Sequence, residues 1–183
     1  MADKLKKDKG SLTPEAYSEK SAPSLKKKKD CAVILPGSYD PPTLGHYALI
    51  KRAAEEYREV YAVAFINPKK NYTFTPTERV SMLMLTTEEF DNVLTSFSTG
   101  LVIDYMRDHG IEKIIKGYRN DTDLEYEKIQ AEWNLSHGGY ETLLYPADDG
   151  LEDLSSTRAR ALIEKGEDLT GILHPAVIEY IKK

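Results

Sequence analysis

The sequence predicts an α/β protein with a Rossmann-like, five-stranded parallel sheet and helices on both faces of the sheet. Short apolar runs of strand length recur along the chain, and segments with apolar residues at helical spacing stand between them. This alternation implies right-handed crossovers and therefore parallel strands. The chain has 183 residues, 40% of them hydrophobic, which is enough for one such domain.

Charge divides the chain into two parts. Residues 1–30 hold nine lysines against five acidic residues, whereas the remainder holds 16 basic and 25 acidic residues. The first part also has few apolar residues and cannot offset its ordering entropy by burial. We therefore expect a basic, disordered leader over residues 1–30 and a folded domain over residues 31–183. The leader is interpreted as a solvated segment, and the alternative is a tether for nucleic acid or an anionic membrane.

Composition also limits the compartment. Cys31 is the single cysteine, so no internal disulfide can form and nothing indicates an oxidising environment. No apolar run has the length of a membrane span, and no signal-peptide core follows Met1. We expect a cytoplasmic protein without a membrane partner.

Local signals predict the elements of the first half. The short apolar run Cys31–Leu35 predicts a strand buried on both faces, and the apolar residues at helical spacing after His46 predict a helix. Val60–Ile66 predicts the second strand. The stretch Thr75-Pro76-Thr77-Glu78 is a capping box with proline at the first helical position, so a helix should begin there. A third strand is expected near Asn92–Ser96.

Glycines and N-cap residues divide the second half in the same way. The expected elements are a helix Leu101–His109 ended by Gly110, a strand Ile111–Lys116, a helix from Asp121 towards Leu135 broken by Gly138-Gly139, a strand Glu141–Tyr145, a helix from Ser155-Ser156-Thr157 to Gly166, and a short helix Ala176–Ile181 begun by His174-Pro175.

Polar residues with a common chemistry follow the predicted strands. Ligands of parallel α/β sheets bind beyond the carboxyl ends of the strands. Hydroxyls, cations and helix starts gather at these ends, and they are the groups that polyphosphates need. The residues are Ser38, Thr43, His46, Lys69, Lys70, Lys116, Arg119, Ser155, Ser156 and Thr157.

Several common sites are excluded by the absence of their motifs. The sequence has no G-x-x-x-x-G-K-[ST] and no G-x-G-x-x-G, which argues against a P-loop protein and a dehydrogenase-type dinucleotide fold. No cysteines and histidines have zinc spacing, and G-x-S-x-G is missing. The acidic loop after Pro146 lacks regular ligand spacing, so no metal ligands are predicted.

One ten-residue stretch carries a family resemblance. Gly37-Ser38-Tyr39-Asp40-Pro41-Pro42-Thr43-Leu44-Gly45-His46 resembles the G-[ST]-[FY]-D-P-x-[TH]-x-G-H signature of nucleotidyltransferases, whose histidine contacts the phosphates of ATP. Relatives often have histidine at the position of Thr43. The threonine here resembles the branch of bacterial phosphopantetheine adenylyltransferases. The resemblance implies the nucleotidyltransferase fold.

Later segments resemble the same branch. Asn67-Pro68-Lys69-Lys70 resembles its lysine loop, and Lys116-Gly117-Tyr118-Arg119 its R-G-x-R segment. The residues from Asp123 to Glu127 resemble its D-[FY]-E-Y-E helix, and Leu154-Ser155-Ser156-Thr157 resembles its I-S-S-[ST] triphosphate cradle. The resemblance covers nearly all of the chain after the leader.

The resemblance implies that the phosphate of 4′-phosphopantetheine attacks the α-phosphorus of ATP and releases pyrophosphate, giving dephospho-coenzyme A. Mg²⁺ would accompany the triphosphate. The implied catalytic residues are His46, Thr43 and Lys70. The implied ATP-binding residues are Ser38, Tyr39, His46, Gly117, Tyr118, Arg119, Glu127, Leu154, Ser155, Ser156 and Thr157, and the implied acceptor-binding residues are Ser38, Lys70, Leu101 and Lys116.

Four positions depart from the family pattern. Lys116 stands where arginine is usual and loses the bidentate fork. Gln130 and Trp133 replace smaller apolar or methionine side chains of the acceptor channel, and Leu151 replaces an aromatic residue near the adenine. Another adenylyl- or cytidylyltransferase, acting for example on nicotinate mononucleotide or glycerol phosphate, is therefore an alternative.

A non-catalytic nucleotide- or nucleic-acid-binding protein is an alternative of another class, although His46, Lys70 and Arg119 argue against it. The resemblance further implies a hexamer and feedback binding of coenzyme A.

Overall fold

The computed structural model describes residues 27–183, so the predicted leader lies outside the described residues except for its last four positions. The predicted fold is confirmed. Five parallel strands form one sheet in the order β3-β2-β1-β4-β5. The strands are β1 (Lys29–Gly37), β2 (Tyr57–Phe65), β3 (Val93–Ser98), β4 (Lys113–Tyr118) and β5 (Glu141–Pro146). The helices are α1 (Leu44–Glu56), α2 (Pro76–Thr87), α3 (Val102–His109), α4 (Asp121–Gly138), α5 (Ser156–Lys165) and α6 (Pro175–Ile181).

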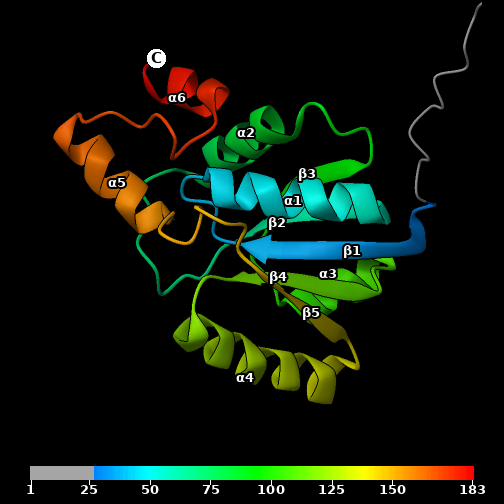
Figure 1. Cartoon of the computed structure of the whole chain (residues 1–183). Coiled ribbons are helices and arrows are strands. Elements are labelled where there is room, and N and C mark those ends of the chain that lie inside the picture. The colour runs from blue at the N-terminus through cyan, green and yellow to red at the C-terminus, as the bar shows by residue number, and fades with distance from the viewer. Residues whose placement is uncertain (1–26) are drawn as a thin grey trace, which may run out of the picture.

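Helices cover both faces of the sheet (Figure 1). On one face, α1 and α2 pack on β1, β2 and β3 around Val33, Leu35 and Ile50. On the other face, α3 packs on a cluster that includes Ile34 and Met106. The alternation of Val33, Ile34 and Leu35 between the two clusters shows that β1 is buried on both sides, as its apolar run predicts.

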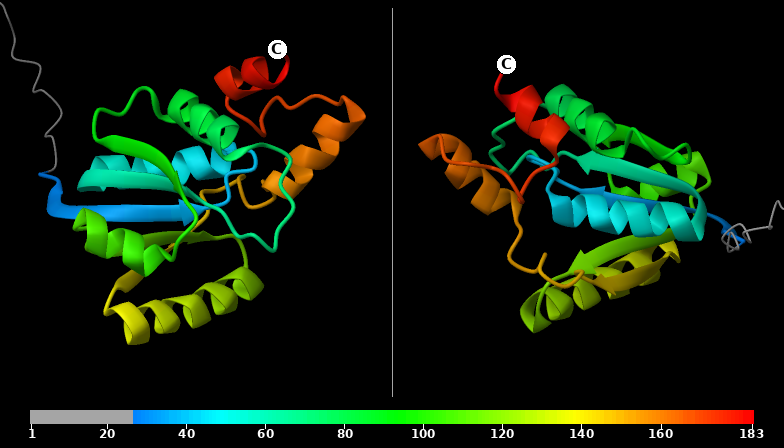
Figure 2. Two further views of the ribbon diagram at one scale, coloured as in Figure 1. Left: turned by 180° about the vertical axis from the view of Figure 1, so that it is seen from behind. Right: turned by 45° about the horizontal axis from the view of Figure 1, so that its top comes forward.

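A third core lies beside the sheet. Met82 of α2 packs with Ala159 of α5, Val177 of α6 and Leu173 of the loop between these two helices. Figure 2 shows α6 beside α2, and it shows α5 beyond the carboxyl end of β1. This cluster holds the N-terminus of α5 close to the ends of the strands, where ligands are expected.

The remaining helix, α4, packs differently. It contacts β4 and β5, yet none of its residues 121–138 is buried. Large apolar side chains are exposed on it, namely Tyr126, Ile129, Trp133 and Leu135. None of the helices within residues 27–183 combines the length and the apolar character of a membrane span.

Most element ends follow the predicted signals. Thr75 caps α2, and Gly110 and Gly166 end α3 and α5 with φ of 65° and 67°, which glycine adopts without steric cost. Two strands begin earlier than expected. β1 starts at Lys29, and β2 starts at Tyr57, because Tyr57 enters the core directly after α1.

Candidate active site

The carboxyl ends of the strands open into two adjoining cavities of about 470 Å³ and 730 Å³. The first lies between the start of α1, the end of β4 and the start of α5. The second lies between the loop 67–73, the start of α3 and the inner side of α4. Both are lined by Pro36, Gly37, Ser38, Lys116 and Tyr126, so two ligands bound side by side would meet there.

The predicted ATP-binding residues all line the first cavity, which brings together Ser38, Tyr39, Thr43, His46, Gly117, Tyr118, Arg119, Glu127, Leu154, Ser155, Ser156 and Thr157. The predicted acceptor-binding residues all line the second, which brings together Ser38, Lys70, Leu101 and Lys116. Lys69, which the sequence pattern adds to the phosphate-binding rim, lines neither cavity.

His46 is oriented by the start of its own helix. Its Nδ1 accepts a hydrogen bond of 2.9 Å from the backbone N–H of Thr43, the N-cap residue of α1. His46 thus does the work that glutamate does in a capping box. Since Nδ1 is an acceptor, the ring proton of the neutral tautomer is on Nε2. This leaves one ring N–H donor for a ligand in the first cavity.

The surroundings keep this ring neutral. Burial, together with the positive charges of Lys116 and Arg119, lowers the pKa of His46 to about 4. At neutral pH His46 is therefore a hydrogen-bond donor without a positive charge. Such a donor can stabilise negative charge that develops on a phosphate oxygen.

Tyr39 supports His46 through its ring. The two ring centroids are 5.0 Å apart, and the Tyr39 hydroxyl donates to the carbonyl of Leu35 at 2.7 Å inside the core. Tyr39 has φ of 50°, unusual for a residue with a side chain. A Cβ at Gly37 would come within 2.9 Å of the Tyr39 ring. The predicted ATP contact of Tyr39 is thus restricted to its ring and backbone, because its hydroxyl is already bonded.

Lys116 lies where the two cavities meet. Its Nζ donates to the carbonyl of Pro36 at 3.4 Å and is 3.7 Å from Oε1 of Glu127. The other oxygen of Glu127, Oε2, is buried without a hydrogen-bond partner. Lys116 can therefore bind a phosphate that bridges the two cavities, and Glu127 offers an acceptor to a polar ligand group.

Arg119 is held by Asp123, which sequence reasoning placed in the acidic helix motif without predicting this contact. Its Nε is 2.7 Å from Oδ2 of Asp123, one turn into α4. This pair leaves the other guanidinium nitrogens of Arg119 available at the cavity wall. A charged pair four residues apart across a helix start is the local signal that could have revealed it.

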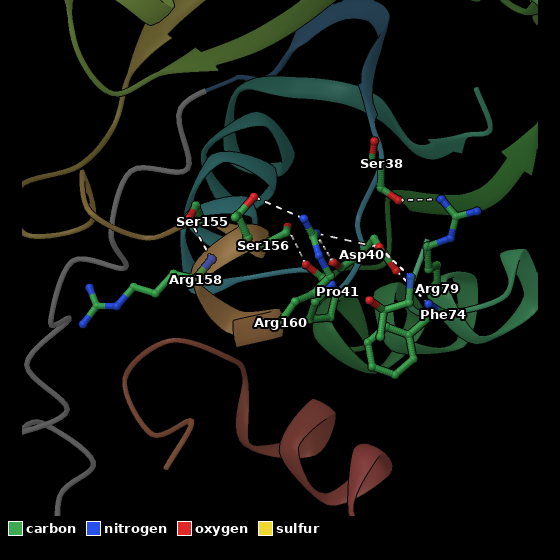
Figure 3. A network of polar contacts seen from close by, with 11 residues as sticks. Ser38, Asp40, Pro41, Phe74, Arg79, Ser155, Ser156, Arg158 and Arg160 are labelled. Carbon is green, nitrogen blue, oxygen red and sulfur yellow. Dashed lines mark hydrogen bonds and ion pairs between the residues drawn. The ribbon is translucent and has the colours of Figure 1, made fainter. Parts of the chain in front are cut away.

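The first turn of helix α5 lines the first cavity, and Figure 3 shows Ser155 and Ser156 at the start of this helix. Ser155 is the N-cap residue and accepts from the backbone N–H of Arg158 at 3.1 Å. Ser156 donates to the carbonyl of Pro41 at 2.8 Å, and Thr157 accepts from Arg160 at 3.2 Å. The free backbone N–H groups of the first turn and the Ser155 hydroxyl proton remain for an anion.

Sequence reasoning gave no role to the residues that hold these loops together, although Asp40 lies in the ten-residue signature. Arg79 is fully buried and donates to the carbonyl of Ser38 at 2.9 Å, while its guanidinium lies 4.1 Å from the centre of the Tyr72 ring. Asp40 accepts from the backbone N–H groups of Thr73 and Phe74. The signal for Arg79 is its position three and four residues before the buried Met82 and Leu83 of α2.

Comparisons with known proteins identify the family. The Cytidylyltransferase-like family matches residues 34–162. A phosphopantetheine adenylyltransferase of Thermobifida fusca is 35% identical over 150 residues, covering 82% of this chain and 92% of the relative. One of Corynebacterium diphtheriae is 38% identical over 145 residues, covering 79% and 91%.

A solved structure supports the fold alone. The structure of a nicotinate-nucleotide adenylyltransferase from Vibrio parahaemolyticus superimposes with a TM-score of 0.61 at 18% identity, covering 84% of this chain and 92% of that one. The sequence relatives are more similar to this chain, at 35% and 38% identity, and the matched regions cover more than nine-tenths of each relative. The chain belongs to the phosphopantetheine adenylyltransferase family of cytidylyltransferase-like proteins.

Proposed function

We propose that the chain transfers the adenylyl group of ATP to 4′-phosphopantetheine, giving dephospho-coenzyme A and pyrophosphate in coenzyme A biosynthesis. The observation that carries the proposal is the pair of cavities that share Ser38 and Lys116, with His46 in one and Lys70 in the other. A donor nucleotide and an acceptor phosphate would meet where the cavities join. The named activity of the relatives supports this substrate pair.

The reaction needs positioning more than a reactive side chain. An oxygen of the acceptor phosphate forms a bond to the α-phosphorus, and the bond from this phosphorus to the oxygen bridging to the β-phosphorus breaks, releasing pyrophosphate. His46 and Thr43 stabilise the α-phosphate in the transition state. Lys70 and Lys116 hold the acceptor phosphate. No covalent enzyme intermediate is required, so alignment and charge stabilisation supply the acceleration.

The start of α5 and Arg119 bind the other end of the nucleotide. The backbone N–H groups and hydroxyls of Ser155, Ser156 and Thr157 suit the β- and γ-phosphates, and Arg119 adds a positive charge opposite them. The leaving pyrophosphate stays in contact with these donors as its charge increases.

Magnesium belongs to this proposal as the companion of the triphosphate. Among the described residues, no group of three or more histidine, cysteine or acidic side chains could hold a metal ion by itself. Glu127 in the first cavity has one carboxylate oxygen without a hydrogen-bond partner. Magnesium in nucleotide sites is usually held by one or two carboxylates together with phosphate oxygens and water, so Glu127 fits the ion together with the triphosphate. When bound, it would neutralise charge on the phosphates.

Family membership extends the proposal to a cytoplasmic homo-hexamer that binds coenzyme A as a feedback inhibitor, with no nucleic-acid partner. The exposed apolar side chains of α4 and β3 are surfaces that subunit contacts would cover. Light scattering of the purified protein tests the hexamer. Titration of coenzyme A into the assay tests feedback inhibition, and a gel-shift assay at low salt tests for nucleic-acid binding.

The decisive experiment is an acceptor screen. Pyrophosphate release is measured with ATP and with CTP against 4′-phosphopantetheine, nicotinate mononucleotide and glycerol phosphate. We expect turnover with ATP and 4′-phosphopantetheine only. Turnover with another pair would move the chain to another acceptor or donor class, and no turnover with any pair would favour a non-catalytic nucleotide-binding protein.

A further inference from the structure

The short stretch 38–41 is a hub that ties together elements far apart in the sequence. Its backbone carbonyls accept from three side chains: Arg79 of α2 at Ser38, Arg160 of α5 at Asp40 with 2.8 Å, and Ser156 of α5 at Pro41. Figure 3 shows these side chains converging on the stretch from both sides.

Asp40 stands at the centre of this hub. Its side chain, with the residue only 2% exposed, accepts from the backbone N–H of Thr73 at 3.0 Å and of Phe74 at 2.9 Å. Nη1 of Arg160 lies 3.7 Å from Oδ2 of the same carboxylate. The Asp40 carboxylate therefore contacts the loop that carries Lys70 on one side and the helix that carries the triphosphate cradle on the other.

Arg160 completes the connection on the α5 side. Besides the Asp40 carbonyl, it donates through Nη2 to the hydroxyl of Thr157 at 3.2 Å. Thr157 lines the first cavity, whereas Arg160 and the Asp40 side chain lie behind it. Arg160 and Asp40 thus reach the ligands only through other residues.

Stability alone does not favour this arrangement. Removing a carboxylate from water is costly, and apolar replacements of buried ion pairs are often neutral or stabilising. In-line transfer, by contrast, needs the attacking oxygen to lie about 3–3.5 Å from the phosphorus before reaction. The distance between the Lys70 loop and the start of α5 sets this separation, because one holds the acceptor phosphate and the other the triphosphate.

We infer that Asp40 and Arg160 are positioning residues, which fix the Lys70 loop against the start of α5 and so align the acceptor phosphate with the α-phosphorus. This inference rests on the proposed function. It differs from a purely structural role in its kinetic consequence. When the connection is broken, each substrate still binds in its own cavity, but the acceptor phosphate is no longer aligned with the α-phosphorus. We therefore expect kcat to fall while the binding of each substrate is retained.

The test uses Asp40→Asn and Arg160→Met. The amide of asparagine offers one acceptor where the carboxylate offers two, and methionine keeps the unbranched stem and the helix propensity of arginine without its donors. We expect kcat to fall about 100-fold in each, with KM and Kd for both substrates within roughly threefold of the wild type. The double variant should be little slower than either single variant, because both act through one connection.

Two matched controls separate this effect from mutation in general. Asp168→Asn changes a carboxylate that accepts from the backbone N–H of Thr170 in a turn outside both cavities. Arg158→Met makes the same change two residues away on α5, where the side chain points away from the hub (Figure 3). Both should keep the wild-type kcat. Unchanged kcat in Arg160→Met, additive losses, or a rise in both KM values without loss of kcat would overturn the inference.

A second readout does not depend on turnover. Hydrogen exchange of the Thr73 and Phe74 amides should become faster in Arg160→Met and stay unchanged in Arg158→Met. The reason is that Arg160 lies next to the Asp40 carboxylate, which accepts hydrogen bonds from both amides. This holds even if the acceptor screen disproves the proposed function, and it also serves if Asp40→Asn does not fold. Unchanged exchange of both amides in Arg160→Met would contradict the connection.

Discussion

The two cavities differ in how their walls are built. The first opens on α1, whose inner face is buried through Ile50, Ala53 and Ala54, and on α5, which packs into the third core. The second is closed on its far side by α4, where Gln130 and Trp133 line the cavity and no residue is buried. Under the proposed function, the donor cavity is built largely from residues that also hold the fold, together with Asp123, Tyr126 and Glu127 of α4, whereas one wall of the acceptor cavity is a helix surface without buried residues. Substitutions in the two walls should therefore have different effects.

The largest effect is expected on the donor side. His46→Ala removes the ring N–H donor. The variant should lose about 3 kcal/mol of transition-state stabilisation, which lowers kcat roughly 200-fold. The loss of its N-cap bond should reduce stability by about 1 kcal/mol, so the variant still folds. Steady-state kinetics and thermal melts measure both. The control is His109→Ala, a histidine at the end of α3 outside both cavities. Wild-type turnover in His46→Ala would remove His46 from the mechanism.

Lys70→Ala tests whether the two cavities are separate in function. A charged hydrogen bond to the acceptor phosphate is worth about 2 kcal/mol, so kcat/KM for the acceptor should fall roughly 30-fold. The Kd for ATP, measured by calorimetry, should stay unchanged, because Lys70 lines only the second cavity. Lys69→Ala is the matched control from the same loop. Equal losses in both variants would point to the net charge of the loop and not to a contact made by Lys70.

A smaller and more selective change is expected on α4. The double variant Gln130→Leu, Trp133→Met widens the second cavity and makes it more apolar. It should raise kcat/KM for 4′-phosphopantetheine relative to a short phosphate acceptor by about tenfold, the scale of a few methylene groups in an apolar pocket. Stability should change by less than about 1 kcal/mol, since Trp133 is already 40% exposed. Leu135→Met on the same helix is the control. Severe destabilisation would contradict the view that α4 varies independently of the core.

The smallest effect concerns pH. Because the pKa of His46 is lowered to about 4, with burial as the main cause, its ring stays neutral from pH 8 down to roughly pH 5. His46 therefore adds no acidic limb near pH 6.5 to the kcat/KM profile. On unfolding, the ring regains its ordinary pKa and binds a proton more readily, so its contribution to stability is lost as pH falls below 6.5. NMR titration of the ring, assigned with His46→Gln, measures this. A midpoint near 6.5 in the folded protein would contradict it.

Sequence reasoning predicts the fold well because its signals are local. The capping box at Thr75 and the glycines at 110 and 166 define element ends within a few residues of chain. The site residues could be named because they cluster in short motifs. The contacts of Asp40 with residues 33, 34 and 120 positions away could not be predicted, since no local pattern encodes which distant amide a carboxylate meets. The same holds for the carbonyl that the buried Arg79 finds at Ser38.

The direction of β1 determines how the protein can be attached to other objects. The strand runs about 26 Å from Lys29 to Gly37, and its arrowhead marks the Gly37 end (Figure 1). Gly37 lines both cavities. A fluorescent label attached at Lys29 itself therefore lies at the opposite end of β1 from Gly37, which lines both cavities. Attachment at this residue should leave the entrances for both substrates accessible, which makes surface-based binding measurements practical for this enzyme.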